Sequence, residues 1–143
     1  MSSADKQEPI IRLARIDDVP RIAELVEPFV QERKLLRRSQ EELRDLARNG
    51  FVAEDQGQVI GFAAGEIYSK KLAELQCLAV DAGYQGRGIG KRLVEACIRC
   101  AKDHRVLELM AITAMDAFFQ DCGFDYSLPD QKRALFINTR PRP

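Results

Sequence analysis

The amino-acid sequence predicts an α/β fold in which about four helices cover a mixed sheet of six or seven strands. Stretches with apolar residues at helical spacing interchange with short β-type segments, in the order β-α-α-β-β-β-α-β-α-β. The chain has 143 residues, 45% of them hydrophobic, which suffices for one core. We therefore expect a single domain over residues 10–143, preceded by a disordered lead over residues 1–9.

The first third of the chain predicts a strand followed by two helices. Residues 10–15 alternate weakly between apolar and polar types, as in a strand. Asp17 and Asp18 are expected to cap the first helix, and Pro28 is expected to end or kink it, because proline supplies no N–H to a helix interior. Ser39 and Glu42 have the spacing of a capping box and predict the start of the second helix.

The rest of the chain changes repeatedly between β-type and helical spacing. We expect strands over residues 51–54, 59–68, 72–80, 107–113 and 135–138, and helices over residues 88–104 and 115–122. The strand at residues 72–80 ends in consecutive apolar residues, which is typical of a central strand buried on both faces.

The composition excludes several classes of function. The chain has 22 Lys and Arg against 22 Asp and Glu, and this net charge of zero argues against a general nucleic-acid binder. No stretch approaches the roughly 18 apolar residues of a membrane span. The polar start MSSADKQEP lacks the apolar segment of a secretory signal. Four cysteines are too few for a disulfide scaffold, so we expect a cytoplasmic protein with reduced thiols and neither nucleic-acid nor membrane partners.

One segment, CLAVDAGYQGRGIGKRL at residues 77–93, combines a strand, a glycine-rich loop and the start of a helix. Glycines leave successive backbone N–H groups accessible, and with the positive end of the helix dipole these groups suit a pyrophosphate. A P-loop is excluded, because Lys91 is followed by Arg92 in place of the serine or threonine that binds magnesium. A dinucleotide-binding fingerprint is excluded, because Gly86-Arg-Gly-Ile-Gly-Lys has the wrong spacing and follows the fourth strand.

The pattern that remains is Gln/Arg-x-x-Gly-x-Gly/Ala, met by Gln85-Gly-Arg-Gly-Ile-Gly90. This segment closely resembles the acyl-CoA-binding motif of the GNAT acetyltransferase superfamily. Phe118-Phe-Gln-Asp-Cys-Gly-Phe124 is similar to the aromatic helix end that is characteristic of that family. The resemblance runs over residues 10–140 and implies a GNAT-like, mostly antiparallel sheet whose central strand is splayed by a β-bulge. It also implies an N-acetyltransferase with acetyl-CoA as co-substrate and a small-molecule amine as acceptor.

The resemblance places the acetyl-CoA site at the end of one strand and in the loop after it. Backbone groups of Leu78 and Val80 are expected to bind the acyl carbonyl and the pantetheine arm, and the loop is expected to bind the pyrophosphate. The residues expected to contact acetyl-CoA are Leu78, Val80, Gln85, Gly86, Arg87, Gly88, Ile89, Gly90 and Lys91.

Three further segments, LRRSQEEL, ELQCLAV and LPDQKRALF, resemble the acetyltransferase domain of bacterial N-acetylglutamate synthase. This resemblance implies glutamate or a similar acidic amino acid as acceptor, whose carboxylates arginine can bind in bidentate fashion. Arg38 and Arg140 are the expected carboxylate ligands, with Thr113 as a further acceptor-binding residue.

Glu74 is the candidate general base, because it matches the glutamate of the related strand and a carboxylate can take a proton from the acceptor ammonium. Glu66 on the neighbouring strand is a second candidate. Phe119 stands where many GNAT enzymes carry a tyrosine that protonates the leaving thiolate, so the acid is unassigned. Water, Cys77 or Thr113 is expected to serve in its place.

Other functions stay open at this point. Another small amine or a protein N-terminus is an alternative acceptor, and a non-catalytic acyl-CoA-binding module is an alternative class. Cys97, Cys100 and His104 superficially suggest a metal site, but they share one helical stripe with Leu93, which is typical of a buried face, so we expect no metal. Dimers are common in this superfamily, so a homodimer is among the states that the resemblance allows.

Overall fold

A five-stranded mixed sheet with the strand order β1-β2-β3-β4-β5 forms the centre of the first of two units of this chain. The computed structural model describes residues 7–126, 135–139 and 141, and the units are Met1–Thr113 and Ala114–Pro143. The strands are β1 (Ile10–Leu13), β2 (Gly50–Asp55), β3 (Gln58–Ile67), β4 (Leu72–Val80) and β5 (Glu108–Ala111). Neighbouring strands are antiparallel, except that β4 and β5 are parallel.

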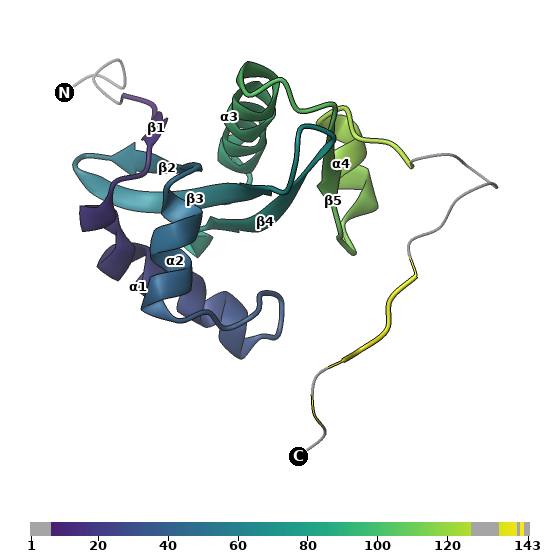
Figure 1. Cartoon of the computed structure of the whole chain (residues 1–143). Helices are drawn as coiled ribbons and strands as arrows, with labels where there is room; N and C mark the ends of the chain where they lie inside the picture. Colours follow the sequence, from purple (N-terminus) through teal and green to yellow (C-terminus); the bar gives the residue numbers. More distant parts are fainter. Residues whose placement is uncertain (1–6, 127–134, 140, 142–143) are drawn as a thin grey trace. The chain divides into compact units, whose positions relative to one another are not determined.

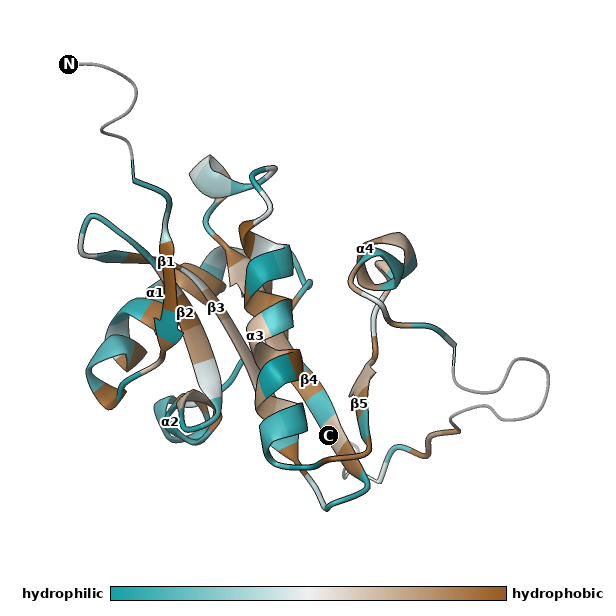
Figure 2. Cartoon of the chain, turned by 90° about the horizontal axis from the view of Figure 1, so that it is seen from above, coloured by the Kyte–Doolittle hydropathy of each residue, from teal (hydrophilic) through white to brown (hydrophobic). Residues whose placement is uncertain are grey.

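The helices of the first unit lie on both faces of this sheet (Figure 1). They are α1 (Val19–Gln31), α2 (Gln40–Ala47) and α3 (Ile89–Asp103), with short 3-10 turns η2 (Ile16–Asp18) and η3 (Ala82–Tyr84). The helices α1 and α2 pack on one face, where Ile22, Leu43 and Phe62 belong to one buried cluster. Helix α3 lies on the other face, and its Leu93 is fully buried. Polar and apolar segments alternate along α3 (Figure 2), as expected of a helix with one side on a sheet.

Two of the predicted helix signals can be compared with the structure. The capping box of α2 is confirmed: Ser39 Oγ accepts a hydrogen bond from Glu42 N at 3.1 Å, and Glu42 Oε1 accepts one from Ser39 N at 2.9 Å. Helix α1 does not end at Pro28 but continues to Gln31. Proline removes a single intrahelical N–H there, close to the end of the helix, and the last turn forms without it.

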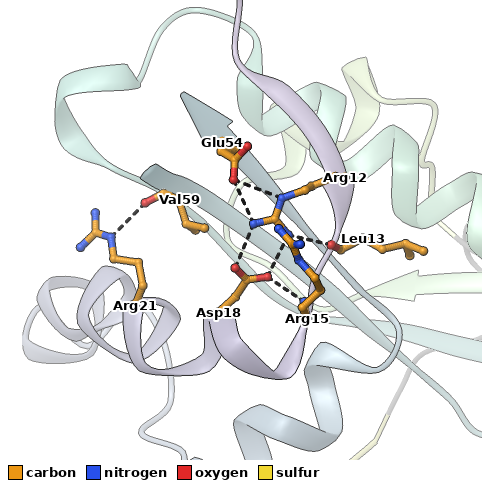
Figure 3. A network of polar contacts seen from close by, with 7 residues as sticks. All are labelled: Arg12, Leu13, Arg15, Asp18, Arg21, Glu54 and Val59. Carbon is orange, nitrogen blue, oxygen red and sulfur yellow. Dashed lines mark hydrogen bonds and ion pairs between the residues drawn. The ribbon is translucent and has the colours of Figure 1, made fainter. Parts of the chain in front are cut away.

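Asp18 occupies the N-cap position of α1 but does not cap the helix with its side chain. Its carboxylate accepts two hydrogen bonds from Arg12, both of 2.9 Å, and one of 2.7 Å from Arg15 N (Figure 3). Arg12 also donates to Glu54 on β2. The carboxylate expected to cap a helix is therefore used to tie β1, β2 and the start of α1 together.

The predicted number of strands, six or seven, is wrong, because five strands form in the described residues. The strand expected over residues 135–138 is absent, although residues 135–139 are described. Leu135, Phe136 and Ile137 are 90%, 77% and 86% exposed. A run of apolar residues becomes a strand only when a neighbouring strand supplies the hydrogen-bonded ladder, and no described strand pairs with this segment. The other predicted elements are confirmed, with small differences at their ends.

The second unit contains helix α4 (Asp116–Asp121). Its Phe119 packs edge to face against Phe118 and Phe124, with ring centroids 5.0 and 5.3 Å apart. The aromatic helix end noted in the sequence thus forms a local cluster. One domain over residues 10–143 stays a prediction, since the chain divides into two compact units. In the described ranges no helix combines the length and the apolar character needed to cross a membrane.

Candidate functional site

Strand β4 changes its pairing half-way along its length. On the β3 side, Ala64 pairs with Cys77 and Gly65 pairs with Leu75, so Gln76 is an extra residue in β4, which makes a β-bulge. On the other side, the parallel pairing with β5 ends at Leu75. The splayed central strand is therefore present. From Gln76 onward, one edge of β4 has no strand beside it among the residues that the structure describes.

This unpaired edge presents the backbone of Leu78 and Val80. Asp81, the residue after β4, donates its N–H to Ile60 O of β3 at 2.8 Å, and this bond is one hydrogen-bonded pair of the ladder between the two strands. Because bonded pairs alternate along an antiparallel ladder, Ala79 makes the next rung, and Leu78 and Val80 direct their N–H and C=O groups away from β3. The N–H groups of both residues and the Leu78 carbonyl thus lie on the unpaired edge, while the Val80 carbonyl accepts a hydrogen bond from Gln85.

The glycine-rich loop between β4 and α3 contains two residues in the left-handed conformation, Gly86 with φ 80° and Gly88 with φ 78°. Gly88 is the N-cap of α3, and Arg92 N donates to Gly88 O at 3.1 Å. The N–H groups of Ile89 and Gly90 precede this first rung of the helical ladder. Together with the positive end of the helix dipole, they give a site suited to a phosphate group.

The fold itself holds several side chains of this loop. Gln85 Nε2 donates to Val80 O at 3.0 Å, so this predicted ligand ties the loop to the end of β4. The Arg87 guanidinium lies 5.0 Å from the centroid of the Tyr84 ring, and Tyr84 OH donates to Asp55 at 2.5 Å. Arg87 is exposed, and its position at the loop surface is suited to an anionic ligand.

A pocket of about 320 Å³ opens beside the bulge, between α1, the loop after α1, α2 and β4. Its charged lining comes from Glu24, Glu27, Arg37 and Arg38, and β4 contributes Cys77. Glu27 and Arg37 are paired through a hydrogen bond of 3.0 Å. A larger hollow of about 500 Å³, between the chain around β1 and α3, contains none of the predicted site residues.

The bulge fixes Arg38 in this pocket. Arg38 Nη2 donates to the backbone carbonyl of Gln76 at 2.8 Å and to Gln76 Oε1 at 3.4 Å. Within the described part of the chain, the Nε and Nη1 groups of Arg38 make no hydrogen bond. The guanidinium is therefore held in place through one nitrogen, and its other donors are available to a carboxylate.

Glu74 is half-buried in β4 and accepts two hydrogen bonds on one oxygen. Tyr68 OH donates to Glu74 Oε1 at 2.5 Å, and Gln76 Nε2 donates to the same oxygen at 3.1 Å. Gln76 Nε2 also donates to Tyr68 OH at 2.7 Å. The other carboxylate oxygen, Oε2, accepts no hydrogen bond from any described residue, so it can accept a proton or an N–H from a ligand.

Two groups in this region have pKa values above their ordinary range. Partial burial, followed by the hydrogen bond to Glu74, raises the pKa of Tyr68 to about 12. Burial raises the pKa of Cys77 to about 11, against the opposing effect of Arg38. Both groups are protonated near neutral pH. Cys77 is therefore a neutral thiol and not a thiolate nucleophile, and its raised pKa makes it a weak proton donor.

Sequence analysis identified neither Tyr68 nor Gln76. The i, i+2 spacing of Glu74 and Gln76 is a weak signal, since it occurs in every strand. Tyr68 follows the end of β3, and its N–H donates to Leu72 O at 3.0 Å across the turn into β4. Only this antiparallel turn brings the phenol to Glu74, so no local pattern could have found it.

The remaining predicted residues are not brought to the pocket by the described contacts. Glu66, the second candidate base, pairs with Glu74 across β3 and β4 and is exposed. Thr113 lies beyond the end of β5 and is exposed, and Arg140 lies outside the described residues. Phe119 belongs to the second unit and has no proton to donate. The acceptor-binding roles of Thr113 and Arg140 stay predictions.

The stripe of Cys97, Cys100 and His104 lies on α3 and at its C-terminal end. His104 Nδ1 is 2.8 Å from the Cys100 carbonyl oxygen, and burial raises the pKa of Cys97 to about 12. In the part of the chain that the structure describes, no three His, Cys, Asp or Glu side chains are grouped as a metal site would need.

Comparison with known proteins connects these features to a family. Residues 16–124 match the profile of the acetyltransferase (GNAT) family. An uncharacterized N-acetyltransferase of Chlorobaculum tepidum is 36% identical over 114 residues, which are 80% of this chain and 74% of that protein. The amino-acid acetyltransferase of Pasteurella multocida is 34% identical over 129 residues, which are 86% of this chain. The chain spans only 29% of the length of that relative.

Solved structures share the fold. The Rv2747 protein of Mycobacterium tuberculosis, solved in complex with CoA, has a TM-score of 0.78 and 29% identity, over 88% of this chain and 77% of that one. N-acetylglutamate synthase of Neisseria gonorrhoeae, complexed with coenzyme A and N-acetyl-glutamate, has a TM-score of 0.77 and 29% identity, over 90% of this chain and 31% of that one.

Proposed function

This chain belongs to the acetyltransferase (GNAT) family, and from that membership we propose that it moves the acetyl group of acetyl-CoA to the primary amine of glutamate or a similar acidic amino acid. The glycine-rich loop and the start of α3 bind the pyrophosphate of the co-substrate. The unpaired edge of β4 binds the pantetheine arm and the acyl carbonyl. The pocket beside the bulge takes the amino acid.

The reaction is a direct transfer within a ternary complex. Glu74 takes a proton from the acceptor ammonium, directly or through water, and the amine nitrogen attacks the thioester carbonyl carbon. A C–N bond forms while backbone N–H groups on the unpaired edge of β4 stabilise the oxyanion. The C–S bond then breaks, the nitrogen gives up its second proton to water, and the leaving thiolate takes a proton from water. Glu74 releases its proton to solvent, so one proton is released for each acetyl group transferred. The products are the N-acetyl amino acid and CoA with a free thiol.

One observation supports the choice of acceptor: Arg38 and Glu74 are joined through the side chain of Gln76. An α-amino acid carries its ammonium and a carboxylate on the same carbon. A base and an arginine separated by one carboxamide can therefore bind both groups at once. A polyamine or a cationic drug has no carboxylate for Arg38, so Arg38 favours an acceptor that carries one.

The proposal is tested by measuring free-thiol release from acetyl-CoA by the purified protein. The acceptors are each of the common amino acids, a polyamine and a peptide with a free N-terminus, and the products are identified by mass spectrometry. We expect turnover with glutamate or aspartate well above that with the other acceptors. Turnover confined to the polyamine or the peptide would show that the acceptor is not an acidic amino acid. Acetyl-CoA binding without any turnover would identify a non-catalytic module.

A further inference from the structure

We propose that Tyr68 and Gln76 are positioning residues that hold Glu74 for proton transfer and couple it to Arg38. This inference rests on the proposed function and deepens it. Neither residue belongs to the glycine-rich motif, and although Gln76 lies in the segment ELQCLAV, the resemblance assigned no role to it or to Tyr68. Both enter the site through the tertiary structure, Tyr68 from the turn after β3 and Gln76 from the bulge in β4.

The hydroxyl of Tyr68 lies between two partners. It accepts a hydrogen bond from Gln76 Nε2 at 2.7 Å and donates one to Glu74 Oε1 at 2.5 Å. Gln76 Nε2 also donates to Glu74 Oε1 at 3.1 Å. The terminal torsion of a glutamate is otherwise broadly distributed, so two donors on one oxygen restrict the rotation of the carboxylate. Oε2 is then the atom that accepts the proton.

Arg38 determines the orientation of the Gln76 carboxamide. A carboxamide can be placed with its oxygen and nitrogen exchanged, and the hydrogen-bond network decides between the two. Arg38 Nη2 donates to Gln76 Oε1, which puts the Gln76 nitrogen toward Tyr68 and Glu74. Arg38, which binds the acceptor carboxylate, and Glu74, which receives a proton from the acceptor ammonium, therefore contact opposite ends of the Gln76 carboxamide.

A merely structural role does not account for Tyr68. The side chain is 49% exposed and lies outside the buried cluster under α1 and α2. Removing its hydroxyl leaves the core intact. The phenol, with a pKa near 12, stays protonated at every pH at which the enzyme would work, so it remains a donor to Glu74 throughout.

The test is a double-mutant cycle on Tyr68→Phe and Glu74→Gln, run with the acceptor that gives the wild-type protein its highest turnover. Tyr68→Phe is expected to lower kcat about 10-fold, the effect of one hydrogen bond to a charged group, with KM for acetyl-CoA unchanged. In the Glu74→Gln background, the same substitution is expected to change kcat less than about 2-fold, because Tyr68 acts through that carboxylate. Equal losses in both backgrounds, or wild-type kcat in Tyr68→Phe, would overturn the proposal.

A second variant and a matched control separate positioning from damage to the fold. Gln76→Leu keeps the side-chain volume and removes both links, so we expect it to lower kcat and also to raise KM for the acceptor, with wild-type thermal stability. Tyr126→Phe removes a similar bond, from Tyr126 OH to Asp116 at 2.6 Å, in the second unit. That control is expected to leave kcat unchanged. An equal loss in the control would overturn the positioning role.

The outcomes distinguish this inference from the proposed function. A wild-type protein without turnover on any amine would overturn the proposed function, and the positioning role with it. If the wild-type protein shows turnover but the effects of Tyr68→Phe and Glu74→Gln on kcat are additive, only the inference is overturned. Ultraviolet titration gives a readout besides turnover: Glu74→Gln is expected to move the Tyr68 transition, assigned as the one lost in Tyr68→Phe, to lower pH. An unchanged transition would contradict the hydrogen bond on which the inference rests.

Discussion

Arg12 uses every nitrogen of its guanidinium inside the protein, whereas Arg38 uses one. The Arg12 side chain donates to Glu54, to Asp18 and to the carbonyl of Leu13, with five hydrogen bonds in all (Figure 3). Arg38 donates through Nη2 alone, to the bulge in β4. Both arginines hold irregular points of the same sheet, Arg12 near its β1 edge and Arg38 at the bulge in β4.

The two arginines belong to two polar networks. We call the contacts among Arg12, Asp18 and Glu54 the closed network, and those among Arg38, Gln76, Glu74 and Tyr68 the open network. The closed network has no donor left for a ligand, and its side chains are largely shielded from solvent, 20% exposed for Arg12 and 10% for Asp18. The open network keeps donors on Arg38, which lines the pocket, and an acceptor on Glu74. A half-satisfied network contributes little to the stability of a fold, so we propose that its open groups bind a ligand. Variants of the closed network should change stability, and variants of the open network should change activity.

The largest effect is expected in the glycine-rich loop, which belongs to neither network. Gly88→Glu puts a carboxylate against the pyrophosphate, which at about 4 Å and an effective dielectric constant of about 20 costs about 4 kcal/mol. Acetyl-CoA affinity is expected to fall about 1,000-fold by calorimetric titration. Gly57→Glu is the matched control: Gly57 has φ 79°, and its Cβ would also meet no atom within 4 Å. Unchanged affinity in Gly88→Glu would contradict the assignment of the loop.

The next largest effect compares one carboxylate from each network. Glu74→Gln is expected to lower kcat about 100-fold, because it removes the base, while acetyl-CoA affinity stays at the wild-type value. Glu54→Gln is expected to lower thermal stability and leave kcat unchanged. Steady-state kinetics and calorimetry measure both. A loss in Glu66→Gln that exceeds the loss in Glu74→Gln would move the role of base to the neighbouring strand.

The two arginines give the most direct test of the comparison. Arg38→Gln removes the donors for the acceptor carboxylate, and KM for the acceptor is expected to rise about 30-fold while KM for acetyl-CoA stays unchanged. Arg12→Gln leaves two carboxylates without their partner, and it is expected to lower the melting temperature with KM unchanged. The opposite distribution, with stability lost in Arg38→Gln and KM raised in Arg12→Gln, would break the comparison.

The smallest effect is a pH-dependent loss of stability in the closed network. The hydrogen bonds from Arg12 lower the pKa of Asp18 below its ordinary value of 3.8, against the opposing effect of burial. A lowered pKa in the folded state stabilises the protein above the unfolded pKa, and this contribution is lost as the pH falls through the folded pKa. Asp18→Asn is therefore expected to lower the free energy of unfolding by about 1–2 kcal/mol at pH 7, and by progressively less as the pH falls below 3.8 and through the lowered pKa of Asp18. Urea denaturation at pH 7 and at a series of acidic pH values measures it, and a difference that does not decline with falling pH would contradict the ion pair.

The local geometry of the segment proposed to bind acetyl-CoA could be predicted because its parts are consecutive in the chain. A strand end, glycines that adopt positive φ and the first turn of α3 lie within one short segment, and each part follows from a local rule of backbone geometry. The capping box at Ser39 and Glu42 is local in the same way, and it is confirmed. Asp18 satisfies the rule for a helix cap but binds Arg12, because a nearby guanidinium is the stronger partner.

The acceptor half was predicted less completely. Arg38 and Glu74 were named from the family resemblance, and the structure links both of them to Gln76, which was not predicted. The strand expected at residues 135–138 shows the same limit, since its apolar pattern carries no information about a pairing partner.

Local sequence was enough for the helices, the order of the strands along the chain and the glycine loop, because apolar spacing and backbone φ act over a few residues. The family was indicated by the resemblance of two short motifs. Strand register, the bulge at Gln76 and the contacts of Tyr68 with Glu74 arise only when β3, β4 and β5 pair in the folded chain. A shift of one residue in that pairing would move every side chain to the other face of the sheet. These features could not be predicted because the register of the strands selects hydrogen-bond partners that are distant in sequence. That register is set only when the sheet assembles.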